Sequence, residues 1–161
     1  MFVVNLFTKL IYCAYIDQMH SYFTFEIKAL SLQLDILAGK YLKATYNISY
    51  SEFLVLLSLA SCKSLTQRQI AHWTQLSEMV ISNLVKSLVA QQKLLKRVNP
   101  TNKRENVITI SAQAAAQALA ALAELDALFL SQLSQQAQQQ AHQIHPTISE
   151  IHHDFRGAPP Q

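Results

Sequence analysis

Residues 65–111 read LTQRQIAHWTQLSEMVISNLVKSLVAQQKLLKRVNPTNKRENVITIS. Thr66 and Gln69 have the spacing of a capping box, in which the two residues satisfy N–H groups at the start of a helix. After a turn near Leu76, Ser77 is a suitable N-cap for a second helix. Two short helices joined by a tight turn form a candidate helix-turn-helix. The second would turn one apolar face inward: Val80, Leu84, Val85 and Leu88.

The same stretch then changes its periodicity. Segments 94–98 and 106–110 are short and rich in apolar and β-branched residues, and a polar turn sequence separates them at 99–105. This pattern predicts a β-hairpin with a basic tip. A helix pair followed directly by such a hairpin is the order of a winged helix-turn-helix. Its second helix can enter the major groove of DNA, while the hairpin reaches phosphates or the minor groove.

Long helices are predicted on both sides of this unit. Ser49 and Glu52 form a capping box that begins a buried helix containing the apolar run 53–57. Before it, a heptad-like stripe predicts a long amphipathic helix over about 21–46: Phe23, Ile27, Leu30, Leu34, Leu37 and Tyr41. After the hairpin, the chain is helical over about 111–152, with one side formed by Ala115, Ala118, Leu122, Leu125 and Phe129.

The expected fold class is therefore mainly α with a small β-hairpin wing, as a winged helix-turn-helix flanked by long N- and C-terminal helices. Pro146 is expected to end or kink the last helix. A length of 161 residues predicts a single domain, which we place at 19–155 with the winged unit at about 50–111. Residues 156–161 are expected to be a frayed tail.

The N-terminal residues 1–18 form an apolar extension, or they precede a true start at Met19. No basic residue precedes the apolar run and Lys9 interrupts it, which argues against a signal peptide. Asp17 ends the run before it reaches the roughly 20 residues of a membrane span. We therefore expect no membrane partner and a cytoplasmic location.

The composition excludes several classes of function. The only glycines are Gly39 and Gly157, so loops that bind phosphate through spaced glycines and the glycine-flanked serine of a nucleophile elbow are absent. Two cysteines are too few for a disulfide scaffold or a four-cysteine zinc site. No catalytic constellation is evident, and we expect neither an enzyme nor a bound cofactor.

The charge is concentrated in one part of the chain. Between Lys63 and Glu105 there are eight basic residues against two acidic ones, a balance of +6, whereas the remaining 118 residues sum to −3. The basic residues are Lys63, Arg68, Lys86, Lys93, Lys96, Arg97, Lys103 and Arg104. Such a block is typical of a protein that binds a polyanion, although a solvated basic face has the same composition.

With these motifs in place, the chain resembles the MarR-type transcriptional regulators over roughly residues 20–150. Leu65–Leu88 resembles the helix-turn-helix of that family, and Asn99–Ser111 resembles its wing. Two positions depart from the family pattern. Gln92 and Lys93 lie where a glycine usually precedes the first wing strand, and Asn102 replaces the aspartate two residues before the wing arginine.

The resemblance implies a homodimeric repressor that binds a pseudo-palindromic site on double-stranded DNA. The helices over about 21–46 and 111–152 would form the dimer, although their stripes could instead be buried in a single-chain core. The implied DNA-binding residues are Arg68, Ser77, Ser82, Asn83, Lys86, Lys103 and Arg104. An asparagine can pair with adenine, a lysine with guanine or phosphate, and Arg104 with Lys103 would probe the minor groove.

The resemblance also implies release from DNA by a small phenolic or other apolar effector. Aromatic candidates for its pocket are Tyr41, Tyr46, Tyr50 and Trp73, which could equally be ordinary core residues. A second possibility is redox sensing by Cys62, whose neighbour Lys63 could lower the thiol pKa, or by Cys13.

Two other functions remain open at this point. The winged unit could bind a protein and not DNA, in which case no selective DNA binding would be found. The histidines His142, His145, His152 and His153 could contribute to a zinc site, but without a further ligand set we favour a solvated helix face and expect no metal.

Overall fold

The computed structural model describes residues 23–62, 64–99, 102 and 105–157. The predictions for 1–18, for Lys63 and for the wing-tip residues Lys103 and Arg104 lie outside these ranges. The described elements are, in order, α2 (Phe23–Tyr46), α3 (Tyr50–Ser61), β1 (Leu65–Thr66), α4 (Gln67–Thr74), α5 (Glu78–Ala90), β2 (Leu94–Val98), β3 (Asn106–Ile110), α6 (Ala112–Ser131) and α7 (Gln135–Gly157). The prediction of a mainly α fold with a small wing is confirmed.

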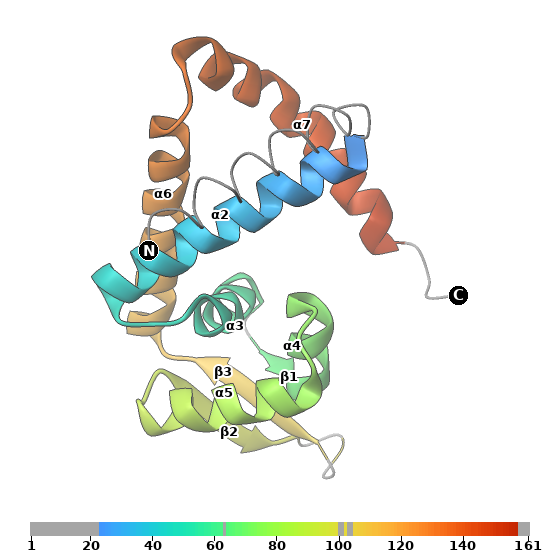
Figure 1. Ribbon diagram of the computed structural model, residues 1–161. Coiled ribbons are helices and arrows are strands. Elements are labelled where there is room, and N and C mark those ends of the chain that lie inside the picture. Colours follow the sequence, from blue (N-terminus) through green and yellow to red (C-terminus); the bar gives the residue numbers. More distant parts are fainter. Residues whose placement is uncertain (1–22, 63, 100–101, 103–104, 158–161) are drawn as a thin grey trace, which may run out of the picture.

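The two ends of the molecule differ in character. Figure 1 shows the long helices α2, α6 and α7 at one end and α4, α5 and the sheet at the other, with α3 between them. Helix α3 makes its most extensive contacts with α6 and α4 and also packs on α2, α5 and β3. It therefore joins the long helices to the winged unit.

The predicted helix starts are confirmed by their hydrogen bonds. The Ser49 N–H donates to Glu52 Oε2 at 2.8 Å, and the Thr66 N–H donates to Gln69 Oε1 at 2.8 Å, each as half of a capping box. Ser77 accepts from the N–H of Val80 and caps α5. These bonds join residues three positions apart, so they can form as soon as the local turn does.

The sheet has three antiparallel strands in the order β1-β3-β2. The hairpin of β2 and β3 was predicted, whereas β1 was not. Strand β1 has two residues, too few to show a strand periodicity in the sequence, and it exists because Leu65 and Thr66 pair with Ile108 and Val107 of β3. This pairing attaches the start of α4 to the wing.

The predicted inner faces of two helices are confirmed only in part: Val85 and Leu88 of α5 and Ala118 and Leu125 of α6 are buried as predicted, but other members differ. In α5 the buried side chains are Ile81, Val85 and Leu88, while Val80 is exposed and Leu84 half-buried. In α6 the buried ones are Ala114, Ala118, Ala121 and Leu125, while Ala115, Leu122 and Phe129 are only half-buried. Small alanines allow α6 to approach α3 closely, so the buried face consists of three alanines and Leu125 and excludes the larger Leu122 and Phe129.

The apolar stripe of α2 is not buried along its length. Ile27 and Leu30 are exposed, and Leu34, Leu37 and Tyr41 are half-buried, while the side chain of Phe23 lies outside the described part. The buried residues of α2 are Ala38 and Leu42, near its C-terminal end. Among the described residues, the stripe is therefore exposed at Ile27 and Leu30 and becomes covered toward the C-terminal end of the helix.

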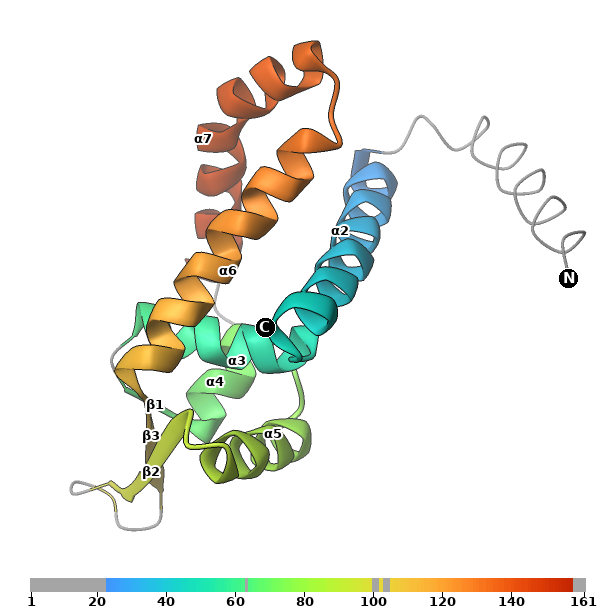
Figure 2. The ribbon, with the colours of Figure 1, turned by 90° about the vertical axis from the view of Figure 1, so that its left-hand side faces the viewer.

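The C-terminal helical region is divided at a different place from the one predicted. Helix α6 ends at Ser131 and α7 begins at Gln135, whereas the chain remains helical through Pro146 to Gly157. Pro146 therefore does not end the helix, and residues 156–157 belong to α7. Figure 2 shows the turn between α6 and α7 at the end of the molecule farthest from the wing.

Helix α6 is also long and apolar enough to cross a membrane, with a mean hydropathy of 1.4. A core helix passes the same test. Because α6 packs on α3 and α2 and buries four side chains there, we interpret it as a core helix.

Candidate nucleic-acid interface

The orientation of α5 follows from the core residues on its neighbours. The turn before it is closed by Gln75, whose φ of 57° ends α4 in the left-handed conformation, and by the Ser77 cap. Ile70 of α4 is buried together with Ile81 and Leu88 of α5. These contacts hold one side of α5 against the fold and leave the opposite side in solvent.

The solvent side of α5 carries a stripe of four exposed residues: Met79, Asn83, Lys86 and Ala90. At 3.6 residues per turn they lie within roughly 60° of one another and directly opposite Ile81, Val85 and Leu88. We call this set the outward stripe. The predicted contacts Asn83 and Lys86 belong to it, whereas Ser82 lies on its flank and is half-buried. Met79 was not predicted, because an apolar residue in the first turn suggests core packing.

The wing lies at the same end of the molecule as α5 (Figure 2), and its strand β2 carries positive charge. Lys96 and Arg97 are exposed on β2, and neither was named as a contact although both belong to the basic block. The wing turn is closed by hydrogen bonds from the Asn99 N–H to the Glu105 carbonyl at 3.0 Å and from the Glu105 N–H to the Asn102 carbonyl at 2.9 Å.

The connection between α5 and the wing uses Gln92 in the left-handed conformation, with a φ of 59°. The MarR-type regulators usually have a glycine in this region. A residue with a Cβ atom is strained at a positive φ, whereas glycine is not. The N–H of Lys93 donates to the Leu88 carbonyl at 3.0 Å, and the Lys93 carbonyl accepts from the Ser111 N–H. The end of α5, the first wing strand and the start of α6 are thus joined at one residue.

Glu52 links this connection to α3. Burial opposes ionisation of its carboxyl group, but hydrogen bonds from Ser49, the charge of Lys93 and a hydrogen bond from Gln91 outweigh that effect and lower its pKa below the usual range. The start of α3 is thereby tied electrostatically to the segment that follows α5.

Arg68 is exposed at the second position of α4. It lines a polar cleft of about 350 Å³ with Thr66, Gln67, Glu78, Glu105 and Asn106. The Nε2 atom of Gln67 is buried and has no hydrogen-bond partner among the described residues. The two acidic residues of the basic block therefore lie in the same cleft as Arg68 and reduce the positive potential there.

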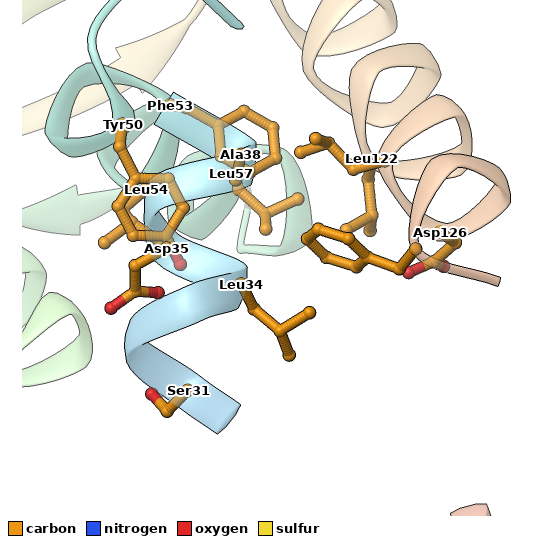
Figure 3. A pocket seen from close by; sticks show the side chains of 12 residues that line it. Ser31, Leu34, Asp35, Ala38, Tyr50, Phe53, Leu54, Leu57, Leu122 and Asp126 are labelled. Atoms are coloured by element: carbon orange, nitrogen blue, oxygen red, sulfur yellow. The ribbon is translucent and has the colours of Figure 1, made fainter. Parts of the chain in front are cut away.

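The four aromatic candidates for an effector pocket do not share one cavity. Tyr50 lines an apolar cleft of about 330 Å³ between α2, α3 and α6 (Figure 3). Tyr46 lines a different hollow of about 260 Å³ and Trp73 a third of about 160 Å³. Within the apolar cleft, Figure 3 shows Tyr50 beside Asp35. Burial and a hydrogen bond to Asp35 raise the pKa of Tyr50 to about 12, so its hydroxyl is protonated at neutral pH.

Tyr41 and Tyr46 serve a different purpose. Their hydroxyl groups both donate to Glu124 Oε2, at 2.9 and 2.7 Å, and so connect the C-terminal end of α2 to α6. These hydrogen bonds lower the pKa of Glu124, and the hydrogen bond to Glu124 followed by burial raises the pKa of Tyr46 to about 12. Both tyrosines are therefore engaged in holding two helices of the fold together.

The described residues contain no group of three histidine, cysteine or acidic side chains that could hold a metal ion. His142 and His145 are exposed on α7. Cys62 is a half-buried free cysteine at the C-cap of α3, and its N–H donates to the Ser58 carbonyl.

Several solved structures of transcription regulators are similar to this one. Wild-type MarR from E. coli is 16% identical with a TM-score of 0.70, and the match covers 81% of this chain and 96% of MarR. MepR, a regulator of the Staphylococcus aureus multidrug efflux pump MepA, is 19% identical with a TM-score of 0.61 over 83% of this chain and 98% of MepR. The chain has the fold of these regulators.

A structure of S. aureus MepR in complex with DNA matches equally well, with 18% identity and a TM-score of 0.61 over 83% of this chain and 98% of that one. No family model matches the sequence, and neither does any curated protein. The predicted winged helix-turn-helix is confirmed as a fold. The outward stripe lies on its α5, and its wing is the hairpin of β2 and β3.

Proposed function

We propose that this protein is a homodimeric transcription regulator that binds double-stranded DNA in a sequence-specific manner. The observation that carries the proposal is the outward stripe, which presents Asn83 and Lys86 to solvent directly opposite the buried face of α5. A helix oriented in this way can enter the major groove with both side chains directed at base edges. The DNA complex of MepR, which has the same fold, supports the proposal.

Each contact has a chemical role in this proposal. Asn83 pairs with the adenine edge, Lys86 binds guanine or phosphate, and Ser77 positions the first N–H groups of α5 near a phosphate. Arg68, Lys96 and Arg97 bind the backbone on either side. Lys103 and Arg104 remain predicted contacts of the minor groove, and Ser82 remains a flanking one.

The uncovered apolar surface supports the homodimer. Large apolar side chains are exposed on the long helices, away from the winged unit: Ile27, Leu30, Leu32 and Ile36 on α2, and Ile144 and Ile148 on α7. Such side chains on two helices at one end of the fold are what an interface between copies requires. A two-fold axis there would place two α5 helices on half-sites about one turn of DNA apart, which favours a pseudo-palindromic operator.

We expect DNA binding to depend on salt and on the outward stripe. Affinity should fall steeply as salt rises, because bound phosphates release counterions. Asn83→Ala should lose about 1–3 kcal/mol of discrimination between the selected site and its adenine variants. Lys86→Ala, if it removes a phosphate contact, should weaken binding on all sequences alike. Fluorescence anisotropy on DNA selected from a random pool measures all three effects.

Lys40→Ala is the matched control for Lys86→Ala, since Lys40 is also an exposed lysine and lies on α2. It should leave affinity unchanged. Weak binding that salt and sequence do not alter would contradict DNA recognition and favour a winged module that binds protein.

The effector belongs to the same proposal. The apolar cleft lined by Tyr50, Leu57 and Leu122 joins α2, α3 and α6, so a ligand there would alter how the long helices sit on the winged unit. Release of DNA on binding would make the protein a repressor that responds to a small aromatic compound. The alternative is redox control, in which oxidation of Cys62 changes the affinity for DNA. If peroxide leaves DNA binding unchanged, this alternative is contradicted.

We expect small phenols to release DNA from the wild-type protein and to do so less effectively from Leu122→Trp, because the indole fills the apolar cleft. Leu119→Trp places the same ring on the exposed part of α6 and should respond as the wild type does. Titration of a phenol panel into the protein–DNA complex, followed by anisotropy, measures the release. Equal release from both variants would place the effector elsewhere.

A further inference from the structure

Met79 has the most exposed large apolar side chain among the residues that the structure describes, with 74% of its surface in solvent. A single exposed apolar residue is common on protein surfaces and needs no explanation by itself. The position of Met79 is more informative. It lies in the first turn of α5, in line with Asn83 and Lys86 on the outward stripe and opposite the residues that anchor the helix.

We propose that Met79 recognises the 5-methyl group of a thymine in the operator. The inference rests on the proposed DNA-binding function and adds a specificity-determining residue to it. The thymine methyl is the apolar group that a base presents in the major groove, and apolar side chains contact it. The first residues of a recognition helix are those that reach base edges. Methionine suits this contact because its unbranched, polarizable side chain adapts to an irregular apolar surface.

The spacing on the helix places the thymine relative to the adenine. Met79 precedes Asn83 by four residues, which is about 6 Å along the helix axis. Successive bases of one strand are about 3.4 Å apart. Met79 therefore reads a base pair one or two steps from the one that Asn83 reads, and both belong to the same half-site.

The test is a cycle that changes the protein and the base independently. Operator DNA is first selected from random duplexes with the full-length protein. Each thymine of the half-site is then replaced by uracil, which removes only the methyl group, and anisotropy is measured with wild type, Met79→Ala and Met79→Leu. At one position, uracil should weaken wild-type binding about fourfold, as expected for loss of one buried methyl-sized group. The same change should leave Met79→Ala unaffected, whereas Met79→Leu should retain the sensitivity.

The outcomes separate this inference from the function on which it rests. Selective binding with no thymine at which Met79→Ala abolishes the uracil effect would overturn the role of Met79 and leave DNA recognition intact. If no sequence is selected at all, the proposed function fails, and the role of Met79 fails with it. Because Met79 is exposed, its substitution should not alter the unfolding midpoint, and circular dichroism checks this.

Discussion

Replacing Leu30 and Ile148 together with glutamate is expected to convert the proposed homodimer to a monomer of 18.1 kDa. The two side chains are 52% and 51% exposed on α2 and α7. In a two-fold dimer each substitution occurs twice, so four apolar side chains are lost from the interface. At roughly 1.5 kcal/mol for each, the dimer would lose about 6 kcal/mol, or on the order of 10⁴-fold in its dissociation constant.

Analytical ultracentrifugation at micromolar concentration measures this change directly. Val98→Glu is the control, because Val98 is also exposed, on β2 at the opposite end of the fold. It should remain dimeric. DNA affinity should fall with the dimer, since a monomer can bind only one half-site. A monomeric wild-type protein would contradict the dimer proposal and would leave the exposed residues of α2 and α7 to another partner.

The largest loss of stability is expected for Ile108→Ala. Ile108 is fully buried in β3, the central strand, where it lies between Leu65 of β1 and Lys96 of β2. Truncation of a buried isoleucine to alanine lowers the free energy of unfolding by about 2–5 kcal/mol, because apolar burial is lost and a cavity remains. The free energy of unfolding of a typical domain is about 5–15 kcal/mol, so this substitution removes a large fraction of the total stability.

Urea unfolding followed by circular dichroism, at one fixed protein concentration, measures this loss. Val98→Ala is the matched control in the neighbouring strand, where the side chain is 61% exposed, and it should change the free energy of unfolding by less than about 0.5 kcal/mol. Equal stability of the two variants would mean that the sheet contributes little to the core.

The helix starts and the order of the winged unit could be predicted from the sequence because they depend on neighbours in the chain. Thr66 and Gln69 form their capping box over three residues, and Ser77 caps α5 in the same way. The basic block could be named from composition alone, since charge needs no tertiary contact to be recognised. The candidates Asn83 and Lys86 rest on the resemblance of Leu65–Leu88 to the helix-turn-helix of the MarR-type regulators.

The outward direction of Met79 and the separation of the aromatic candidates could not be predicted in this way. Periodicity indicates that a helix is amphipathic, but it does not decide whether Val80 or Ile81 joins Val85 and Leu88 at the buried edge of α5. That choice depends on the side chains that α3 and α4 present to α5. Likewise Tyr46 and Tyr50 are four residues apart, yet they line different hollows because the turn between α2 and α3 separates them.

By itself, then, the sequence determined the helix boundaries of the winged unit, its hairpin and the position of its charge, because local hydrogen bonds and composition specify these. Only the tertiary structure decided that Leu65 and Thr66 form a strand, that α6 packs mainly through alanines, and that Ile27 and Leu30 of α2 stay exposed. Each of these features depends on contacts between elements that are distant in the sequence. The shape of the partner element determines which side chains are buried, and the spacing of residues along one helix or strand does not.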